Sequence, residues 1–328
     1  MSAAASTQNA RLERAQGCLL GQLAGDSLGS LVEFRSAADI RQQYPDGIHE
    51  LADGGTFDTL AGQPTDDSEM ALLLARMLVE QGIYDREAAR LAYIDWLYSD
   101  PFDIGFTIRS GLQGQHNLTS QANGALMRIS PLGIFGANYE LRQVAEWARQ
   151  DATLTHVHPV CQEANALYAM AIATAVREGC DAESLYAQIR AWSREMQVDA
   201  SLQTAIEAAA DSPPADYLSL QGWVLIAFQN ALWQLLHAQN LQEGVCDTVM
   251  RGGDTDTNAA IAGALLGAVY GRAAIPAQWT MSILACCPQA GQPGVYQPRP
   301  KRFWPVDALE LAAGLLGQES RVATGAAG

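Results

Sequence analysis

The chain has 328 residues, of which 48% are hydrophobic and 17% are charged, and its formal net charge is −16. This length and balance are typical of a globular protein with a sizeable core. The negative charge argues against nucleic acid as the main target, because phosphate binding needs positive charge. The N-terminus has no apolar signal-peptide core, no segment reaches membrane-spanning length, and the cysteines lack zinc-type spacing. We therefore expect a reduced, cytoplasmic protein that does not act at a membrane.

Helical patterns follow one another along the chain. Residues 1–10 are small and polar, and we expect them to be disordered. A helix is predicted from Arg11, through a stretch with glycine at every fourth position. Residues 35–64 are rich in Gly, Asp and Pro, and are expected to form a long loop. Further helices are predicted at about 66–78, 85–96, 138–150, 160–178, 181–196, 217–238, 241–250, 259–271 and 306–317, with shorter ones after Pro101 and Pro276.

Strand patterns are missing, because alternating β-branched runs are absent and Ala, Leu and Gln dominate. The sequence predicts a single all-α domain over residues 11–317, followed by a flexible tail at 318–328. Two of its helices have one face without Cβ atoms, and we expect these faces to pack closely on each other. The glycines are Gly17, Gly21, Gly25 and Gly29 in the first helix and Gly263, Gly267 and Gly271 in the second.

Two carboxylates precede the second of these helices. Asp254 and Asp256 lie in the stretch RGGDTDTN, which also supplies the Thr257 hydroxyl. A lone Asp at this place would usually be a helix cap. An EF-hand loop would need Gly at the sixth position and Glu at the twelfth, where this chain has Ala259 and Leu265. That alternative is excluded, whereas capping stays open.

A second cluster, Thr65-Asp66-Asp67-Ser68, opens another predicted helix. Two Thr/Asp clusters at two helix starts favour one metal site over unrelated caps. The four carboxylates together could not all stay ionised without cations. Ligands that are all oxygen favour Mg²⁺ or Mn²⁺, with Ca²⁺ as a further candidate, and the charges match two ions. The predicted ligands are Thr65, Asp66, Asp67, Asp254, Asp256 and Thr257.

Weaker candidates each have an ordinary alternative. His156, in THVHP, either contacts a ligand or is a satisfied core residue. The loop SQANG at 120–124 either cradles an anion with its N–H groups or is simply flexible. Arg128 either adds charge to that loop or pairs with a carboxylate. Glu33 is either a general acid/base or metal ligand, or a solvated surface residue.

Taken together, these residues resemble the ADP-ribosylglycohydrolase family, which includes the dinitrogenase-reductase-activating glycohydrolases. The resemblance covers about residues 11–317. The TDD and GGDTDT motifs are its most specific part. The segments that carry it are GCLLGQLAGDSLGSLVE, TDDSEMAL, FDIGFTIRSGL, NGALMRISPLG, THVHP, RGGDTDTNAAIAGALLGAVYG and RPKRFWP.

The resemblance implies an orthogonal helical fold around a binuclear Mg²⁺ or Mn²⁺ site formed by the ligands named above. It implies hydrolysis of the bond from C1″ of ADP-ribose to a protein side chain, with free ADP-ribose as product and the enzyme acting as a monomer. The implied catalytic residues are Glu33, in a mobile entrance loop, with Asp67 and Asp256. The implied substrate-binding residues are Asp103, near the leaving group, and Ser120, Asn123, Gly124, His156 and Gly253.

Phe106, Ile108 and Ala125 depart from the family pattern without removing a metal ligand, which leaves the acceptor side chain open. We expect arginine-linked substrates ahead of serine-linked ones. Alternatives are a non-catalytic ADP-ribose-binding or structural protein, an immunity-type protein that blocks a partner, and a hydrolase of another small N- or O-glycoside. Intact acidic clusters favour catalysis, because a protein without turnover has no need of mutually repelling carboxylates.

Overall fold

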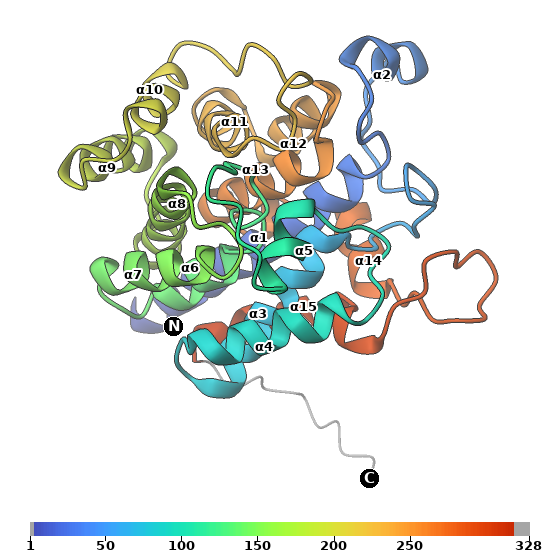
Figure 1. Cartoon of the computed structure of the whole chain (residues 1–328), viewed down its shortest axis with the longest axis horizontal. Coiled ribbons are helices and arrows are strands. Elements are labelled where there is room, and N and C mark those ends of the chain that lie inside the picture. The colour runs from blue at the N-terminus through green and yellow to red at the C-terminus, as the bar shows by residue number, and fades with distance from the viewer. Residues whose placement is uncertain (1–2, 318–328) are drawn as a thin grey trace.

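A computed structural model describes residues 3–317, and two helices lie side by side at its centre (Figure 1). These are α1 (Ala3–Gly29) and α13 (Thr255–Tyr270), from opposite ends of the sequence. The other helices surround them: α2 (Ala37–Gln43), α3 (Asp66–Gln81), α4 (Arg86–Leu97), α5 (Phe106–Leu112), α6 (Ser130–Gly136), α7 (Leu141–Ala152), α8 (Pro159–Glu178), α9 (Ala182–Glu195), α10 (Ala200–Ala208), α11 (Val224–His237), α12 (Leu241–Met250), α14 (Ala277–Ala285), α15 (Ala308–Leu315) and the 3₁₀ helices η1 (Arg272–Ala274) and η2 (Lys301–Phe303).

The contact between α1 and α13 is backbone on backbone. A Cβ atom on Gly21 would lie 2.1 Å from the Gly263 carbonyl oxygen, and one on Gly263 would lie 2.2 Å from the Gly21 oxygen. Gly17 and Gly267 face each other in the same way. This arrangement, called the glycine seam below, confirms the close packing that the four-residue glycine spacing predicts.

The glycine seam continues to the end of α1, where the charged residues begin. A Cβ atom on Gly29 would lie 2.4 Å from Asp256 Cα, so the end of α1 touches the first turn of α13. Asp26 lies one turn earlier on α1 and is fully buried. The seam therefore brings acidic residues from both ends of the chain together inside the core.

The N-terminal helix begins earlier than predicted. Residues 3–10, which we expected to be disordered, form the first turns of α1. They include four alanines, and alanine has the highest helix propensity. The predicted tail at 318–328 lies outside the described residues.

Three short α-helices, α2, α6 and α10, lie where none was predicted. The expected loop at 35–64 contains α2, whose start is capped by the Ser36 side chain. Asp199 caps α10 in the same way. The helix predicted at 217–238 begins only at Val224, because Gly222 has a φ of +79° and interrupts the helical path.

The absence of strands is confirmed, since the backbone of residues 3–317 forms only three isolated bridges. None of the helices in this range has the length and apolar character that crossing a bilayer requires. One continuous apolar core joins most helices, and α13 is buried from Thr255 to Ala268. Its acidic first turn is therefore enclosed as deeply as its apolar turns.

Candidate active site

The two acidic motifs lie at the start of α3 and of α13. Thr65 is the N-cap of α3 and Asp254 is the N-cap of α13. Neither side chain accepts a capping hydrogen bond from its own helix, so ordinary capping does not account for the two clusters. The Thr257 hydroxyl reaches from α13 to α3 and donates to Asp67 Oδ2 over 3.3 Å. The two predicted clusters therefore form one site.

Asp26 belongs to this site and was not predicted. Its carboxylate accepts backbone N–H groups of Thr65 at 3.2 Å and Ser68 at 3.1 Å, and lies 2.9 Å from the Thr65 hydroxyl. Asp26 therefore caps α3 from another helix. Burial raises its pKa to about 7, although these hydrogen bonds oppose the rise. A signal existed in the sequence, because Asp26 is the only charged residue between Arg14 and Glu33.

Glu33 is held in the loop after α1 and is only 6% exposed, which excludes the surface alternative. The loop is tied to the start of α13, because Phe34 N–H donates to the Gly253 oxygen and Gly253 N–H donates to the Arg35 oxygen. Gly253 has a φ of +77°, and a Cβ atom there would lie 2.0 Å from the Tyr217 oxygen. The structure thus places Gly253 behind Glu33, where it anchors this loop.

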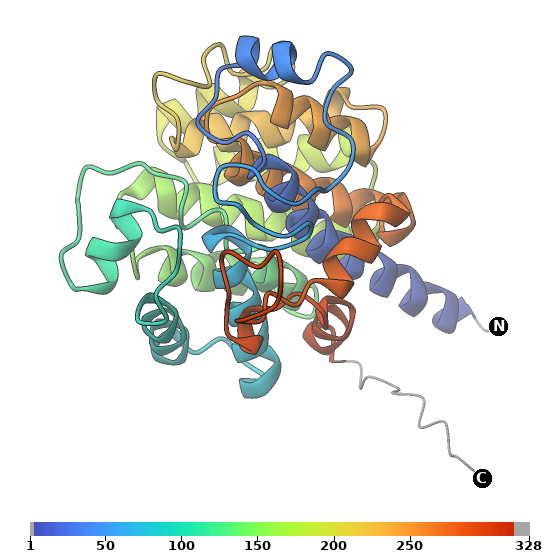
Figure 2. The ribbon, with the colours of Figure 1, turned by 90° about the vertical axis from the view of Figure 1, so that its right-hand side faces the viewer.

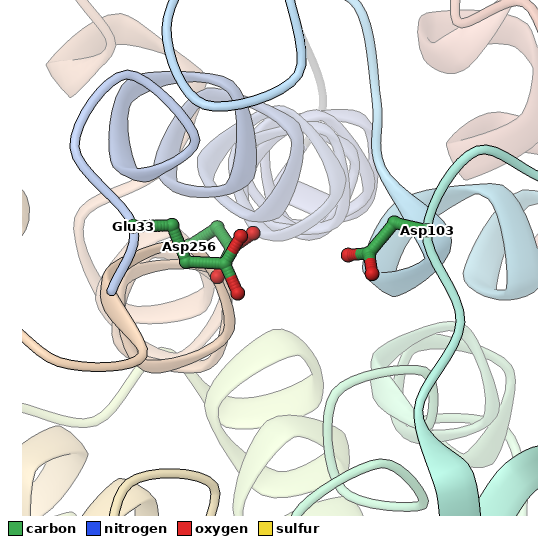
Figure 3. Close-up of side chains that lie close together, drawn as sticks. All are labelled: Glu33, Asp103 and Asp256. Carbon is green, nitrogen blue, oxygen red and sulfur yellow. The ribbon is translucent and has the colours of Figure 1, made fainter.

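Glu33, Asp103 and Asp256 bring their carboxylates together from three separate elements (Figure 3). One oxygen of each lies within 4.8 Å of the others. Burial, followed by the charges of neighbouring carboxylates, raises the pKa of Glu33 and of Asp256. Burial also raises the pKa of Asp103, although a hydrogen bond with Asp66 opposes the rise. These groups stabilise one another's protonated forms, and a cation would stabilise their ionised forms.

The acids at the start of α3 share this environment. Burial and nearby carboxylates raise the pKa of both Asp66 and Asp67. Asp67 Oδ1 and Glu33 Oε2 are buried and have no hydrogen-bond partner in the described part of the chain. Within residues 3–317, none of the carboxylates discussed so far forms an ion pair. Acceptor oxygens without a counter-charge fit hard divalent cations such as Mg²⁺ or Mn²⁺.

A cavity of about 350 Å³ opens over this cluster. Thr65, Asp67 and Asp256 do not line it and are buried beside it. The predicted site residues that do line it are Glu33, Asp66, Asp103, Asn123, Gly124, His156, Asp254 and Thr257. The structure therefore collects most of the predicted residues around one space.

The 120–124 loop forms one wall of the cavity. The Asn123 side-chain amide donates to Asp254 Oδ2 over 2.7 Å, which joins this loop to the acidic cluster. Ser120 does not line the cavity. Its hydroxyl lies 2.8 Å from the hydroxyl of Thr107, which does. Ser120 thus reaches the cavity only through Thr107.

His156 lines the cavity, and hydrogen bonds on the side away from the cavity hold its ring in place. Arg128 and Asp151, both fully buried, form an ion pair with 3.0 Å between Nε and Oδ1, which settles the alternatives for Arg128. Arg128 also donates to the Thr155 hydroxyl over 2.9 Å, and that hydroxyl lies 2.8 Å from His156 Nδ1. Donation of the Thr155 hydrogen to Nδ1 is consistent with the tautomer that carries the histidine hydrogen on Nε2.

His156 is therefore a neutral donor. Burial and the nearby Arg128 lower its pKa to about 3. Its Nε2 is buried without a hydrogen-bond partner among the described residues. A neutral N–H group at a cavity wall is suited to donate to an oxygen of a bound ligand.

Comparison with known proteins identifies the family of the chain. Residues 7–292 match the sequence model of the family described as ADP-ribosylglycohydrolase. The ADP-ribosyl-[dinitrogen reductase] glycohydrolase of Rhodospirillum rubrum is 31% identical over 283 residues, which cover 81% of this chain and 89% of that protein. The ADP-ribosylarginine hydrolase Tri1 of Pseudomonas putida (strain GB-1) is 27% identical over 295 residues, which cover 84% of this chain and 76% of that protein.

A solved structure gives the same result for the fold. A chain of an ADP-ribosylglycohydrolase-related protein complex superposes with a TM-score of 0.77 at 26% sequence identity. The superposition covers 94% of this chain and 98% of that chain. The similarity in fold therefore extends over most of the chain, and the family match at residues 7–292 includes both acidic motifs. This chain belongs to the ADP-ribosylglycohydrolase family of glycosidic-bond hydrolases.

Proposed function

We propose that this protein is a hydrolase dependent on divalent cations that removes mono-ADP-ribose from a modified protein side chain. The bond cleaved is the one at C1″ of ADP-ribose, and arginine-linked substrates are preferred. The observation that carries the proposal is the buried cluster of oxygen ligands beside a cavity, in which Asp67 Oδ1 and Glu33 Oε2 have no partner. We expect the protein to act as a monomer in the cytoplasm and to release free ADP-ribose.

The cations would be held by the oxygens that link α3 and α13. The proposed ligands are Thr65, Asp66, Asp67, Asp254, Asp256 and Thr257, for two Mg²⁺ or Mn²⁺ ions. Divalent cations bound there supply the positive charge that these carboxylates lack and polarise oxygens of the ligand. Support comes from the Thr257–Asp67 hydrogen bond, which shows that both halves of the ligand set meet.

Glu33 is the proposed proton carrier. It lines the cavity, and its pKa is raised by burial and by Asp256 and Asp254, so that the carboxyl can hold a proton near neutral pH. In the hydrolysis, water oxygen bonds to C1″ while the bond from C1″ to the acceptor atom breaks. Protonated Glu33 gives its proton to the leaving group and takes one proton back from the attacking water, so that the protons balance over the turnover. Asp103, within 4.8 Å of Glu33, lies on the opposite side for contact with that leaving group.

The 120–124 loop and His156 would hold the rest of ADP-ribose. His156 offers an N–H group from Nε2, and Asn123 is already oriented by Asp254. Neither residue carries charge, so they would position the ligand by hydrogen bonds. Ser120 would support this wall through Thr107.

The mouth of the cavity favours an arginine-linked acceptor. Phe34 and Phe106 both line the cavity, and their side chains are 55% and 75% exposed. A phenyl ring can stack on a guanidinium plane, whereas a serine hydroxyl offers no such surface. The excess of acidic residues also attracts a cationic acceptor.

The test is the release of free ADP-ribose from arginine-linked and serine-linked substrates with Mg²⁺, Mn²⁺ or EDTA. We expect release with either cation, faster for the arginine linkage, none with EDTA, and a loss of at least about 100-fold for Asp256→Asn. Faster release from the serine linkage would overturn the acceptor preference. No release from either substrate, together with tight ADP-ribose binding, would overturn the hydrolase proposal and indicate a binding protein.

A further inference from the structure

Arg299 connects two parts of the site from a segment that lies beyond the family match, which ends at residue 292. This segment joins α14 to α15 and lies alongside α3 (Figure 2). The Arg299 side chain is 3% exposed, and all five of its N–H groups are used. Nε donates to Glu69 Oε1, Nη2 to Glu69 Oε2 and the Ser99 hydroxyl, and Nη1 to the Ser99 and Asp100 carbonyl oxygens, all over 2.8–2.9 Å.

Two of the partners of Arg299, Glu69 and Asp100, lead directly to candidate catalytic residues. Glu69 lies on α3, two residues after Asp67, and its carboxylate also accepts the Trp96 indole N–H over 2.8 Å. Asp100 follows α4 with a φ of +57°, at the start of the turn that leads to Asp103. The left-handed conformation of a non-glycine residue needs support from its surroundings, and Arg299 binds this carbonyl oxygen. One guanidinium group therefore fixes α3 relative to the Asp103 turn.

The same segment holds a second loop of the site. The Gln297 side chain donates to the Phe57 oxygen over 2.9 Å, and the Gln63 side chain donates to the Gln297 oxygen over 2.7 Å. Phe57 also contacts Phe102, with 5.6 Å between ring centroids. The loop before Thr65 and the turn before Asp103 are thus fastened to one another and to the C-terminal segment.

We infer that Arg299 is a positioning residue that holds the Asp103 turn against the start of α3. In this position the Gly105 N–H group lies 3.4 Å from Asp66 Oδ2, and Asp103 faces Glu33 across the cavity. Lysine would keep the charge but cannot bind two oxygens of Glu69 and two carbonyl oxygens at once. The expected effect of Arg299 on kcat rests on the proposed function. Its expected effect on the stability of the Asp103 turn does not.

Arg76 provides a matched control. It lies on the same helix α3 and attaches to the same part of the chain, through the Asp307 carboxylate and the Arg302 and Trp304 carbonyl oxygens. Among the described residues, none of its side-chain hydrogen bonds or ion pairs reaches the turn that carries Asp103. Arg76→Lys therefore weakens the attachment of the C-terminal segment to α3 without releasing that turn.

The experiment compares Arg299→Lys with Arg76→Lys in the full-length protein. Amide hydrogen exchange of residues 98–106 is measured by mass spectrometry, and kcat and KM for ADP-ribose release are measured with Mg²⁺. We expect Arg299→Lys to speed exchange in this turn by about tenfold or more and to lower kcat by about 10- to 100-fold, with KM within about threefold. For Arg76→Lys, we expect exchange and kcat to stay within about threefold of the wild type.

A second variant, with a smaller change, tests the same inference if Arg299→Lys fails to fold. Ser99→Ala removes one of the five Arg299 hydrogen bonds and also the bond from the Ser99 hydroxyl to the Trp96 carbonyl oxygen, and it should change exchange and kcat in the same direction, by about two- to threefold. Unchanged exchange in the Arg299→Lys turn, or equal changes in Arg76→Lys, would overturn the inference. If the wild type releases no ADP-ribose, the proposed function fails, while the exchange comparison still decides the role of Arg299.

Discussion

Two groups of buried charges lie in this fold, and their charges are balanced differently. Arg128 and Asp151 are fully buried and neutralise each other, and Arg299 pairs with Glu69 in the same way. The carboxylates at the starts of α3 and α13 are buried equally deeply, yet no cation of the described chain contacts them.

The difference separates a structural role from a chemical one. A buried ion pair whose hydrogen bonds are satisfied holds elements together and leaves nothing for a ligand to bind. Buried carboxylates without a partner destabilise the protein unless an ion or a ligand compensates them. Burial of charge alone would not have identified the site here. The missing counter-charge identifies it.

The largest expected effect tests this contrast directly. Asp151→Asn leaves the buried guanidinium of Arg128 without its counter-charge, and should lower the free energy of unfolding by about 3–5 kcal/mol. Asp67→Asn in EDTA should not lower it, because one of several mutually repelling acids is replaced. Urea denaturation in EDTA measures the free energy of unfolding of both variants and of the wild type. Equal losses of stability in the two variants would contradict the contrast.

A smaller effect is expected from separating the acids without altering them. Gly263→Ala places a Cβ atom 2.2 Å from the Gly21 oxygen, so α1 and α13 must move apart. The free energy of unfolding should fall by about 1–3 kcal/mol, and the affinity for Mn²⁺ should fall with it. The contact of Arg128 with Asp151 lies outside the glycine seam and should persist.

Gly314→Ala on α15 is the control for the glycine seam. The three atoms nearest to the new Cβ atom would all belong to the side chain of Val79, the closest at 3.0 Å, and Val79 is 41% exposed at the surface. Stability should change by less than about 0.5 kcal/mol, with Mn²⁺ affinity unchanged. Calorimetric titration measures the Mn²⁺ affinity of the two variants. Similar affinities in both would contradict the prediction that the glycine seam positions the metal ligands.

The last prediction concerns the pH dependence of stability at His156, which lies between the two groups of charges. Its pKa is about 3 in the folded protein against an ordinary 6.5, so the unfolded chain binds more protons between these values. Its contribution to stability is complete above pH 6.5 and is lost as the pH falls toward 3, by at most about 1.4 kcal/mol per pH unit. His156→Gln should therefore lose stability less steeply than the wild type between pH 6.5 and 5. Parallel urea midpoints over this range would contradict the burial of a neutral imidazole.

Much of the fold could be predicted because its signals are local. Apolar periodicity located the long helices, and glycine at every fourth position predicted the contact of α1 with α13. The seven-residue helix α6 was not predicted because it is so short, and neither were α2 and α10, which have 7 and 9 residues. Their caps, Ser36 and Asp199, were the available signals.

The site could be predicted in part for the same reason. The two acidic motifs are contiguous in sequence, and the structure joins them through Thr257 and Asp67. Asp26 and Arg299 were missed because each acts on residues far away in the sequence, 39 positions for Asp26 to Thr65 and 230 for Arg299 to Glu69. No periodic pattern reports such partners. An isolated charge within an apolar stretch, as at Asp26, is the signal to search for.

The glycine seam also constrains how the protein can be made. It joins residues 3–29 to residues 255–270, so during translation the first helix leaves the ribosome long before its partner exists. Until then the bare glycine face of α1 has no backbone to pack against, and the slow closure of such a distant contact delays folding. Asp26 and Asp256 meet only in that closure. A nascent chain that stops before α13 therefore contains the first acidic motif but cannot assemble a site.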